Sequence, residues 1–143
     1  DGWAATDDGG LALLIVLDQF TRNTFRGEPK SFAGDPMALQ HAVEGIAAGR
    51  DQRVPPMARI FCYLPLEHAE DPELQARSVA LFAALAAAPG AEPKAFLDNT
   101  SDYAVKHQVV IDRFGRFPHR NAILGRTSTP EEVEYLRQPG SGF

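Results

Sequence analysis

Hydrophobic residues recur at helical spacing along most of the chain. An apolar run at residues 11–20 is longer and richer in leucine than a typical strand, and it predicts a buried helix. Later apolar residues recur at intervals of three and four, which predicts further helices at about 35–49, 55–65, 72–88 and 94–114, and cap signals predict a last helix at about 130–138. No segment of useful length alternates in the manner of a strand. The pattern therefore predicts an all-α protein.

The ends of these predicted helices carry residue types with known capping roles. Asp35 and Asp71 each precede a proline, which predicts an N-cap followed by proline at the first helical position. Thr129, with Glu132 three residues later, matches a capping box. Pro65 is expected to interrupt its helix, because proline donates no backbone hydrogen bond and clashes with the preceding turn.

Alanine-rich helices joined by short turns of proline and glycine favour close packing of helix pairs. We expect a single domain over residues 1–143, made of packed antiparallel helical hairpins in a TPR-like or α-solenoid-like arrangement, although no repeat of fixed period is visible. With 143 residues, of which 44% are hydrophobic, the chain can bury a core without disulfides or a structural metal.

Composition also limits the environment and the partners. The single cysteine, Cys62, lies in an apolar run, which predicts a buried thiol in a reducing compartment and hence a cytoplasmic protein. No stretch approaches the roughly 20 apolar residues of a membrane span, and the first residues lack a signal-peptide pattern, so we expect no membrane insertion. A net charge of −5 argues against general nucleic-acid binding.

Positive charge is nevertheless concentrated in one segment. Between residues 103 and 126, five Lys or Arg residues stand against one Asp, a local charge of +4 that leaves −9 for the rest of the chain. Guanidinium groups bind phosphate and carboxylate well, so a pocket for an anion is one prediction from Arg113, Arg116, Arg120 and Arg126. The alternative is that these arginines pair with carboxylates of the protein or with helix C-terminal carbonyls.

Histidines in this part of the chain differ in context. His119 lies in a turn between Pro118 and Arg120, where loops present functional groups, and it is the strongest single functional candidate. His107 falls on the apolar stripe of the preceding helix and is more typical of a core histidine. His41 supports no functional hypothesis.

A polar cluster follows the first apolar run. Asp18 and Arg22 lie four residues apart on the predicted helix, close enough to pair, and Gln19 and Asn23 repeat that spacing beside them. The apolar residues before Asp18 make full exposure of this face improbable. Either a partly buried structural network or a ligand site fits the pattern.

A second cluster follows Pro65. Glu67 and His68 offer metal ligands or an acid–base pair, because a neighbouring carboxylate raises the pKa of an imidazole and fixes its tautomer. Adjacent helical residues point about 100° apart, however, and the HExxH spacing is absent. Glu70 and Asp71 are explained by the helix start that follows them, where negative charge is stabilised.

Three segments, residues 17–23, 63–71 and 113–126, carry these motifs, and in this order they resemble the uncharacterised family DUF924. The most specific is the Arg-Phe-Pro-His-Arg-Asn run at 116–121, followed by Leu-Gly-Arg at 124–126. Thr21 and Ala69 are minor departures from the family pattern. The resemblance spans about residues 3–136 and implies an all-helical, TPR-like fold with a further helical segment before Trp3. It implies no activity.

The first function hypothesis is a pocket for a small anionic molecule, in an enzyme or a binding protein. Arg116 and Arg120 would hold the anion and His119 would move a proton. Asp18, Glu67 and His68 would orient these groups or bind a metal. The other polar residues assigned to the pocket are Arg22, Asn23, Arg113 and Asn121.

Two other hypotheses remain open. The helices could form a TPR-like module that binds a peptide or protein, or the arginines and carboxylates could only hold helix ends together. Polar residues concentrate in a few short motifs instead of repeating along successive helices, which favours the pocket. Rossmann, P-loop and CxxC signatures are absent, so the sequence names neither a cofactor nor a metal.

Overall fold

The computed structural model describes residues 2–143, and these residues form helices and loops without a strand. The α-helices are α1 (Asp7–Leu14), α2 (Thr21–Thr24), α3 (Asp35–Ala47), α4 (Pro56–Glu67), α5 (Pro72–Ala87), α6 (Lys94–Phe114) and α7 (Pro130–Leu136). Shorter 3-10 segments are η1 (Gly2–Ala5), η3 (Pro29–Phe32), η4 (Asp51–Arg53) and η5 (Pro118–Arg120), while η2 (Ile15–Phe20) is a π-helical segment. The all-α prediction is confirmed. Among the described helices, none combines the length and apolarity needed to cross a bilayer.

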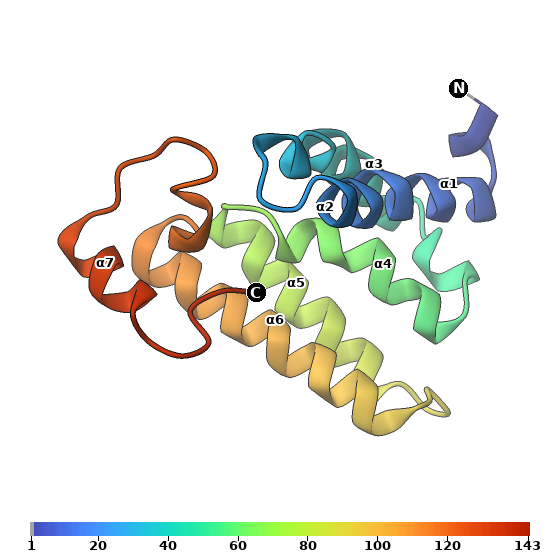
Figure 1. The fold of residues 1–143 in the computed structure, drawn as a ribbon. Coiled ribbons are helices and arrows are strands. Elements are labelled where there is room, and N and C mark those ends of the chain that lie inside the picture. The colour runs from blue at the N-terminus through green and yellow to red at the C-terminus, as the bar shows by residue number, and fades with distance from the viewer. Residues whose placement is uncertain (1) are drawn as a thin grey trace.

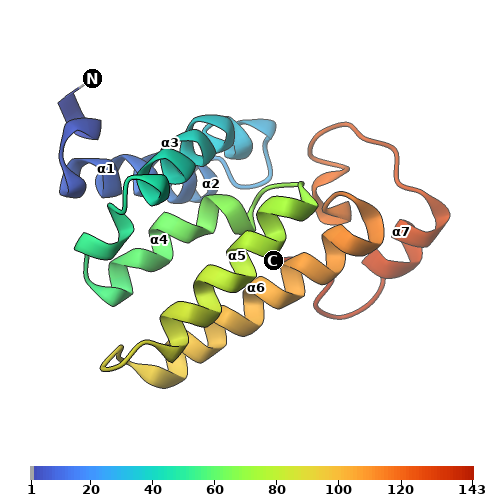
Figure 2. The same ribbon diagram turned by 180° about the vertical axis from the view of Figure 1, so that it is seen from behind.

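The longest helices pack side by side, as Figures 1 and 2 show from opposite directions. Helices α5 and α6 form an antiparallel pair, α4 packs on α5, and α3 and α1 pack on α4. The segment after α6, with η5 and α7, lies at one end of this assembly. Leu66, Phe82, Leu97 and Ala104 are fully buried between the helices. Burial of this apolar surface is the main favourable contribution to folding.

The first predicted helix is longer than its apolar run. Helices α1, η2 and α2 follow one another without a break, so the helical segment extends on both sides of residues 11–20. Thr6 caps its start by accepting a hydrogen bond from the Gly9 backbone N–H. The π-helical segment η2 contains the buried Asp18. π-Helical segments are rare in proteins, and those that occur are frequently found at functional sites.

Capping predictions at α5 and α7 are confirmed, whereas the prediction at α3 is wrong. Asp71 accepts hydrogen bonds from the first-turn backbone of α5, and Thr129 with Glu132 forms the capping box of α7. At α3 the N-cap is Gly34, and Asp35 is already helical. A Cβ at Gly34 would lie 2.1 Å from the Leu17 carbonyl oxygen, so only glycine allows this approach of α3 to η2.

Helix α4 does not end at the proline that was expected to interrupt it. Pro65 lies inside α4, which runs on to Glu67 and is capped by His68. The proline sits in the last turn, and the His68 backbone N–H still donates to the Leu64 carbonyl at 2.9 Å. The missing donor removes one hydrogen bond, the one to the carbonyl four residues earlier, and the helix continues past it. As a result, α4 holds Glu67 and His68 in regular geometry at its C-terminal end.

Candidate functional site

A cleft of about 370 Å³ opens where segments distant in the sequence meet. Its walls come from η2 and α2, the loop after α2, η3, the end of α4, α6, η5 and the C-terminal segment. The lining residues are Gln19, Arg22, Asn23, Arg26, Gly27, Ser31, Phe32, His68, His107, His119, Arg120, Ile123 and Phe143. This volume falls within the usual range of small-molecule sites.

Asp18 connects the first two sequence motifs behind the cleft wall. One of its carboxylate oxygens, Oδ1, lies 2.6 Å from Nδ1 of His68 and accepts a hydrogen bond from Nε of Arg22 at 3.2 Å. Gln19 donates to the other oxygen. Burial opposes ionisation, but these hydrogen bonds outweigh it and lower the pKa of Asp18 to about 2. Asp18 is therefore ionised and orients His68 toward the cleft.

The end of α4 is held in place by a buried glutamine. Gln75, on α5, has no exposed surface, and its side-chain amide donates to the backbone carbonyls of Glu67 at 2.6 Å and Ala69 at 2.8 Å. The Glu67 carbonyl ends α4 and the Ala69 carbonyl lies in the turn that follows, so neither has a partner within the helix and Gln75 satisfies both. The bonds fix the backbone that carries Glu67 and His68.

Glu67 and His107 form a buried pair next to His68. Oε1 of Glu67 lies 3.1 Å from Nδ1 of His107, which is also 2.8 Å from the Tyr103 carbonyl oxygen. Burial, together with the nearby charge of Asp18, raises the pKa of Glu67 to about 8. Burial also lowers the pKa of His107 to about 3. One ligand atom each from Glu67, His68 and His107 lies within 4.8 Å of the others, a grouping that could hold a metal ion.

Arg120 is a charged residue that is almost completely buried in the wall of the cleft. Only 6% of its surface is exposed, yet its side chain makes no hydrogen bond to residues 2–143, and Nε is buried without a partner. The nearest carboxylate oxygen belongs to Asp35, 3.9 Å away. The rings of Phe32 and Phe117 lie 4.9 and 4.4 Å from the guanidinium carbon. Burial lowers the pKa of Arg120 to about 10, so the group remains charged at neutral pH.

His119 stands beside Arg120 in the wall of the cleft. Its Nδ1 is buried and has no hydrogen-bond partner among the described residues. Burial and the charges of Arg120 and Arg22 lower the pKa of His119 to about 4, so the imidazole is neutral at pH 7. The 3-10 turn η5, which begins at Pro118, positions both side chains. His119 thus presents a neutral imidazole to the cleft.

The structure brings some of the predicted residues together and separates others. Five line the cleft, and Asp18 and Glu67 lie behind its wall; the five are Arg22, Asn23, His68, His119 and Arg120. Three lie elsewhere, because partners outside the cleft bind them. Arg113 pairs with Glu131, Arg116 with Glu132, and the Asn121 amide donates to Ser128 and Glu132.

Comparison with known proteins identifies the family. The sequence profile described as "Bacterial protein of unknown function (DUF924)" matches residues 1–140. This chain belongs to the DUF924 family. It is also similar to a solved structure, the protein of unknown function ATU0120 from Agrobacterium tumefaciens, with 44% sequence identity and a TM-score of 0.83. The match covers 96% of this chain and 72% of the Agrobacterium protein. No curated protein matches the chain.

Some residues in or beside the cleft wall of this DUF924 protein carry no functional signal in the sequence. Asp35 is predicted as a helix cap, but its Oδ2 accepts a hydrogen bond from Arg22 Nη2 at 2.6 Å. Phe32 belongs to no polar motif. The sequence pattern is typical of a core histidine at His107. In the structure His107 is buried, and its ring also forms part of the cleft wall. Hydrophobic periodicity reports burial, and it cannot show that a buried ring also borders a cavity.

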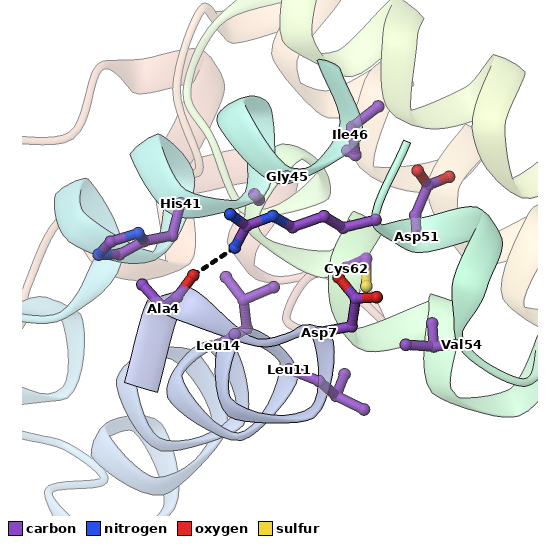
Figure 3. Close-up of a pocket in the computed structure, with 13 residues that line it drawn as sticks. Ala4, Asp7, Leu11, Leu14, His41, Gly45, Ile46, Asp51, Val54 and Cys62 are labelled. Atoms are coloured by element: carbon purple, nitrogen blue, oxygen red, sulfur yellow. Dashed lines mark hydrogen bonds between the residues drawn. The ribbon is translucent and has the colours of Figure 1, made fainter. Parts of the chain in front are cut away.

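A second cavity in the DUF924 protein, drawn in Figure 3, has a different character. Its volume is about 40 Å³, room for no more than a few water molecules. Leu11, Leu14 and Cys62 are among the residues that line it, and Arg50 donates a hydrogen bond to the Ala4 carbonyl beside it. Burial raises the pKa of the Cys62 thiol to about 11, which makes it unreactive. The larger cleft is therefore the candidate functional site.

Proposed function

We propose that the cleft binds a small molecule carrying a phosphate or carboxylate group, and that the protein acts on this molecule as an enzyme. The observation that carries the proposal is the buried Arg120 side chain, which makes no hydrogen bond within residues 2–143. Removing a charged group from water is costly unless other hydrogen bonds replace those to water. An anion bound in the cleft would supply them.

The surroundings of Arg120 leave its donors available to such a ligand. The faces of Phe32 and Phe117 stabilise the positive charge, but they accept no strong hydrogen bond. Asp35 lies too far from the guanidinium for a hydrogen bond and is occupied by Arg22 instead. Because a guanidinium presents several donors in one plane, it binds carboxylate or phosphate in a bidentate manner.

Among the described residues, two other buried atoms at or beside the cleft have no hydrogen-bond partner. They indicate which further groups the ligand would carry. Oδ1 of Asp35 can accept a hydrogen bond, and Nδ1 of His119 can accept or donate one according to its tautomer. A ligand with a hydroxyl or amino group close to its anionic group would satisfy both. The proposed ligand class is therefore a polar metabolite with one anionic group and at least one hydrogen-bond donor.

His119 supports a catalytic role in addition to binding. Its imidazole is neutral at pH 7 and borders the cleft, so it can accept a proton from a bound molecule. The charges of Arg120 and Arg22 contribute to lowering its pKa. A bound anion would offset these charges and raise the pKa of His119 toward neutrality, where proton transfer is most effective.

The test is a thermal-shift series on the full chain with inorganic phosphate, pyrophosphate and small hydroxycarboxylates as probes. A ligand of the native state raises the melting temperature by mass action, equivalent to about 2.7 kcal/mol at a hundred times Kd. We expect at least one probe to stabilise the wild type. Arg120→Met should weaken that binding at least tenfold, because it removes the donors and keeps most of the side-chain volume.

Arg113→Met is the matched control. It removes an arginine of the same segment that is exposed and paired with Glu131 outside the cleft, so the stabilisation should persist. For a probe that proves to be a substrate, His119→Gln should lower turnover roughly 100-fold while binding remains. Equal stabilisation of wild type and Arg120→Met would overturn the proposal. Failure of every anion would do the same and would favour the peptide-binding hypothesis.

A further inference from the structure

Two histidines in the wall of the cleft are each held by a hydrogen-bond acceptor at Nδ1. Nδ1 of His68 lies 2.6 Å from the Asp18 carboxylate, and Nδ1 of His107 lies 2.8 Å from the Tyr103 carbonyl oxygen. Because ionised carboxylates and carbonyls only accept hydrogen bonds, both Nδ1 atoms carry the proton. The Nε2 atoms are then unprotonated. Histidines that bind metals in proteins usually have this arrangement, with the second nitrogen donating to a carboxylate or carbonyl.

Glu67 supplies a third donor at the same place. Its side chain is buried, and within residues 2–143 its carboxyl group makes no hydrogen bond; Oε1 lies 3.1 Å from Nδ1 of His107. Ligand atoms of Glu67, His68 and His107 lie within 4.8 Å of one another. Two ligands about 2.1 Å from a tetrahedral ion lie about 3.4 Å apart, so closure around a metal requires the ligand atoms to approach one another by up to about 1.4 Å.

The local charge balance permits a cation. The guanidinium groups of Arg22 and Arg120 oppose a positive ion, but the carboxylates of Asp18 and Asp35 accompany them. Glu67 then adds the negative charge that compensates part of the charge of a divalent ion. A buried carboxyl without hydrogen bonds is costly in its ionised form, and a metal would relieve that cost.

From this geometry we infer that the protein binds one divalent transition-metal ion, of the zinc and cobalt class, at the inner end of the cleft. Nε2 of His68, Nε2 of His107 and the Glu67 carboxylate are its ligands. Two imidazoles and one carboxylate suit these borderline metals better than magnesium or calcium, which prefer oxygen ligands. Because His68 and His107 line the cleft, the remaining coordination position faces it, as in catalytic zinc sites.

The experiment titrates the metal-depleted full chain with Zn²⁺ by calorimetry and with Co²⁺ by visible absorption. We expect one ion per chain and the intense absorption of Co²⁺ in a site of low coordination number. His68→Gln and His107→Gln should each abolish this spectrum. Asp18→Asn should weaken binding about 10- to 100-fold while the ligands remain, because Asp18 only orients His68. Circular dichroism shows whether each variant is folded.

Matched variants separate this inference from the anion proposal. His41→Gln removes a histidine outside the cleft and should bind metal as the wild type does. Arg120→Met should lose phosphate binding and retain the Co²⁺ spectrum, since its side chain is not a ligand. Absence of stoichiometric Zn²⁺ binding by the wild type, or an unchanged Co²⁺ spectrum in folded His68→Gln, would overturn the metal site and leave the anion proposal standing.

Discussion

Two groups of polar side chains both include residues of the loop between α6 and α7, yet they differ in how completely their atoms are hydrogen-bonded. The paired cluster consists of Glu70, Arg116, Asn121, Arg126 and Glu132. Arg126 binds both oxygens of Glu70 at 2.6 and 2.9 Å, and Arg116 binds both oxygens of Glu132 at 2.7 and 2.8 Å. The Asn121 amide joins them by donating to Glu132 and accepting from Arg126. The charges of this cluster are satisfied within the protein.

The cleft cluster consists of Asp35, His119 and Arg120, and each of these residues has a buried atom without a partner. Arg116 and Arg120 are only four residues apart, yet they belong to different clusters. The backbone between them is extended at Phe117 and then turns in the 3-10 segment η5, so the two side chains do not share a helical face. Both clusters contain arginine, and the number of hydrogen bonds that the guanidinium group makes distinguishes a stabilising arginine from one that is available to a ligand.

The largest effect on stability is expected in the paired cluster. Glu132→Ala removes acceptors for Arg116, Asn121 and the Thr129 backbone N–H, and should lower the free energy of unfolding by about 3 kcal/mol. Urea unfolding followed by circular dichroism measures it. Glu131→Ala, at the exposed neighbouring position, should change stability by less than about 0.5 kcal/mol. Similar values for the two variants would contradict the contrast between the clusters.

Acid should weaken the cleft cluster before the paired cluster. The pKa of His119 falls from 6.5 to about 4 on folding through burial and the nearby Arg120, Arg22 and Arg126, with Glu70 opposing them. The unfolded chain therefore binds more protons at His119, and stability is lost as pH falls from 6.5 toward 4. His119→Gln should reduce this loss, on the order of 1 kcal/mol, in unfolding measured at both pH values.

Glu132 should lose its contribution to stability at a lower pH than His119 does. Its hydrogen bonds with Arg116 lower its pKa from 4.5 to about 2, so its contribution is complete above pH 4.5 and disappears as pH falls toward 2. The two losses should thus occupy different pH windows. An equally steep loss between pH 6.5 and 4.5 in wild type and His119→Gln would contradict the assignment.

Removing the unsatisfied arginine should cost little. Arg120→Met deletes a buried charge that makes no hydrogen bond and keeps apolar contact with Phe32 and Phe117. We expect stability without ligand to equal that of wild type or to exceed it by up to about 1 kcal/mol, because an apolar side chain avoids the cost of burying charge. Thermal unfolding in a buffer free of phosphate and carboxylate tests this. A loss near 3 kcal/mol would show that Arg120 is structural.

The smallest effect belongs to the exposed pair. Arg113 and Glu131 are 48% and 62% exposed at their side chains, so water competes for both groups. Arg113→Ala should change the free energy of unfolding by less than about 0.5 kcal/mol and become indistinguishable from wild type at high salt. A change above 1 kcal/mol at both salt concentrations would mean that Arg113 has a role beyond this ion pair.

Local signals in the sequence are sufficient for most of the fold. The capping box at Thr129 and the cap at Asp71 depend on residues within one turn, and both predictions are confirmed. The predictions made at Pro65 and Asp35 are wrong for a common reason. Whether Pro65 ends its helix depends on the packing of α4 against other helices, and the role of Asp35 depends on Arg22, thirteen residues earlier in the chain.

The candidate site could be predicted only in part. The motifs containing Asp18, His68 and Arg120 stood out by composition, and the fold places these residues at one cleft. The sequence could not show that Arg116 and Arg120 belong to different clusters, because either arginine could pair with a carboxylate in some conformation of the chain. Which one is paired depends on the loop path and on the capping role of Glu132. Phe32 illustrates the same limit, because a ring stacked on a cation has no pattern of its own in sequence.

The contact between Gly34 and η2 has a consequence for the range of sequences that this family can accept. A helix start ordinarily tolerates several small polar residues, but here any side chain would strike the Leu17 carbonyl. Substitution would force the two elements apart and move Asp35 away from Arg22. Selection at position 34 would therefore act on the Arg22–Asp35 contact beside the cleft as much as on folding, although a glycine has no functional group.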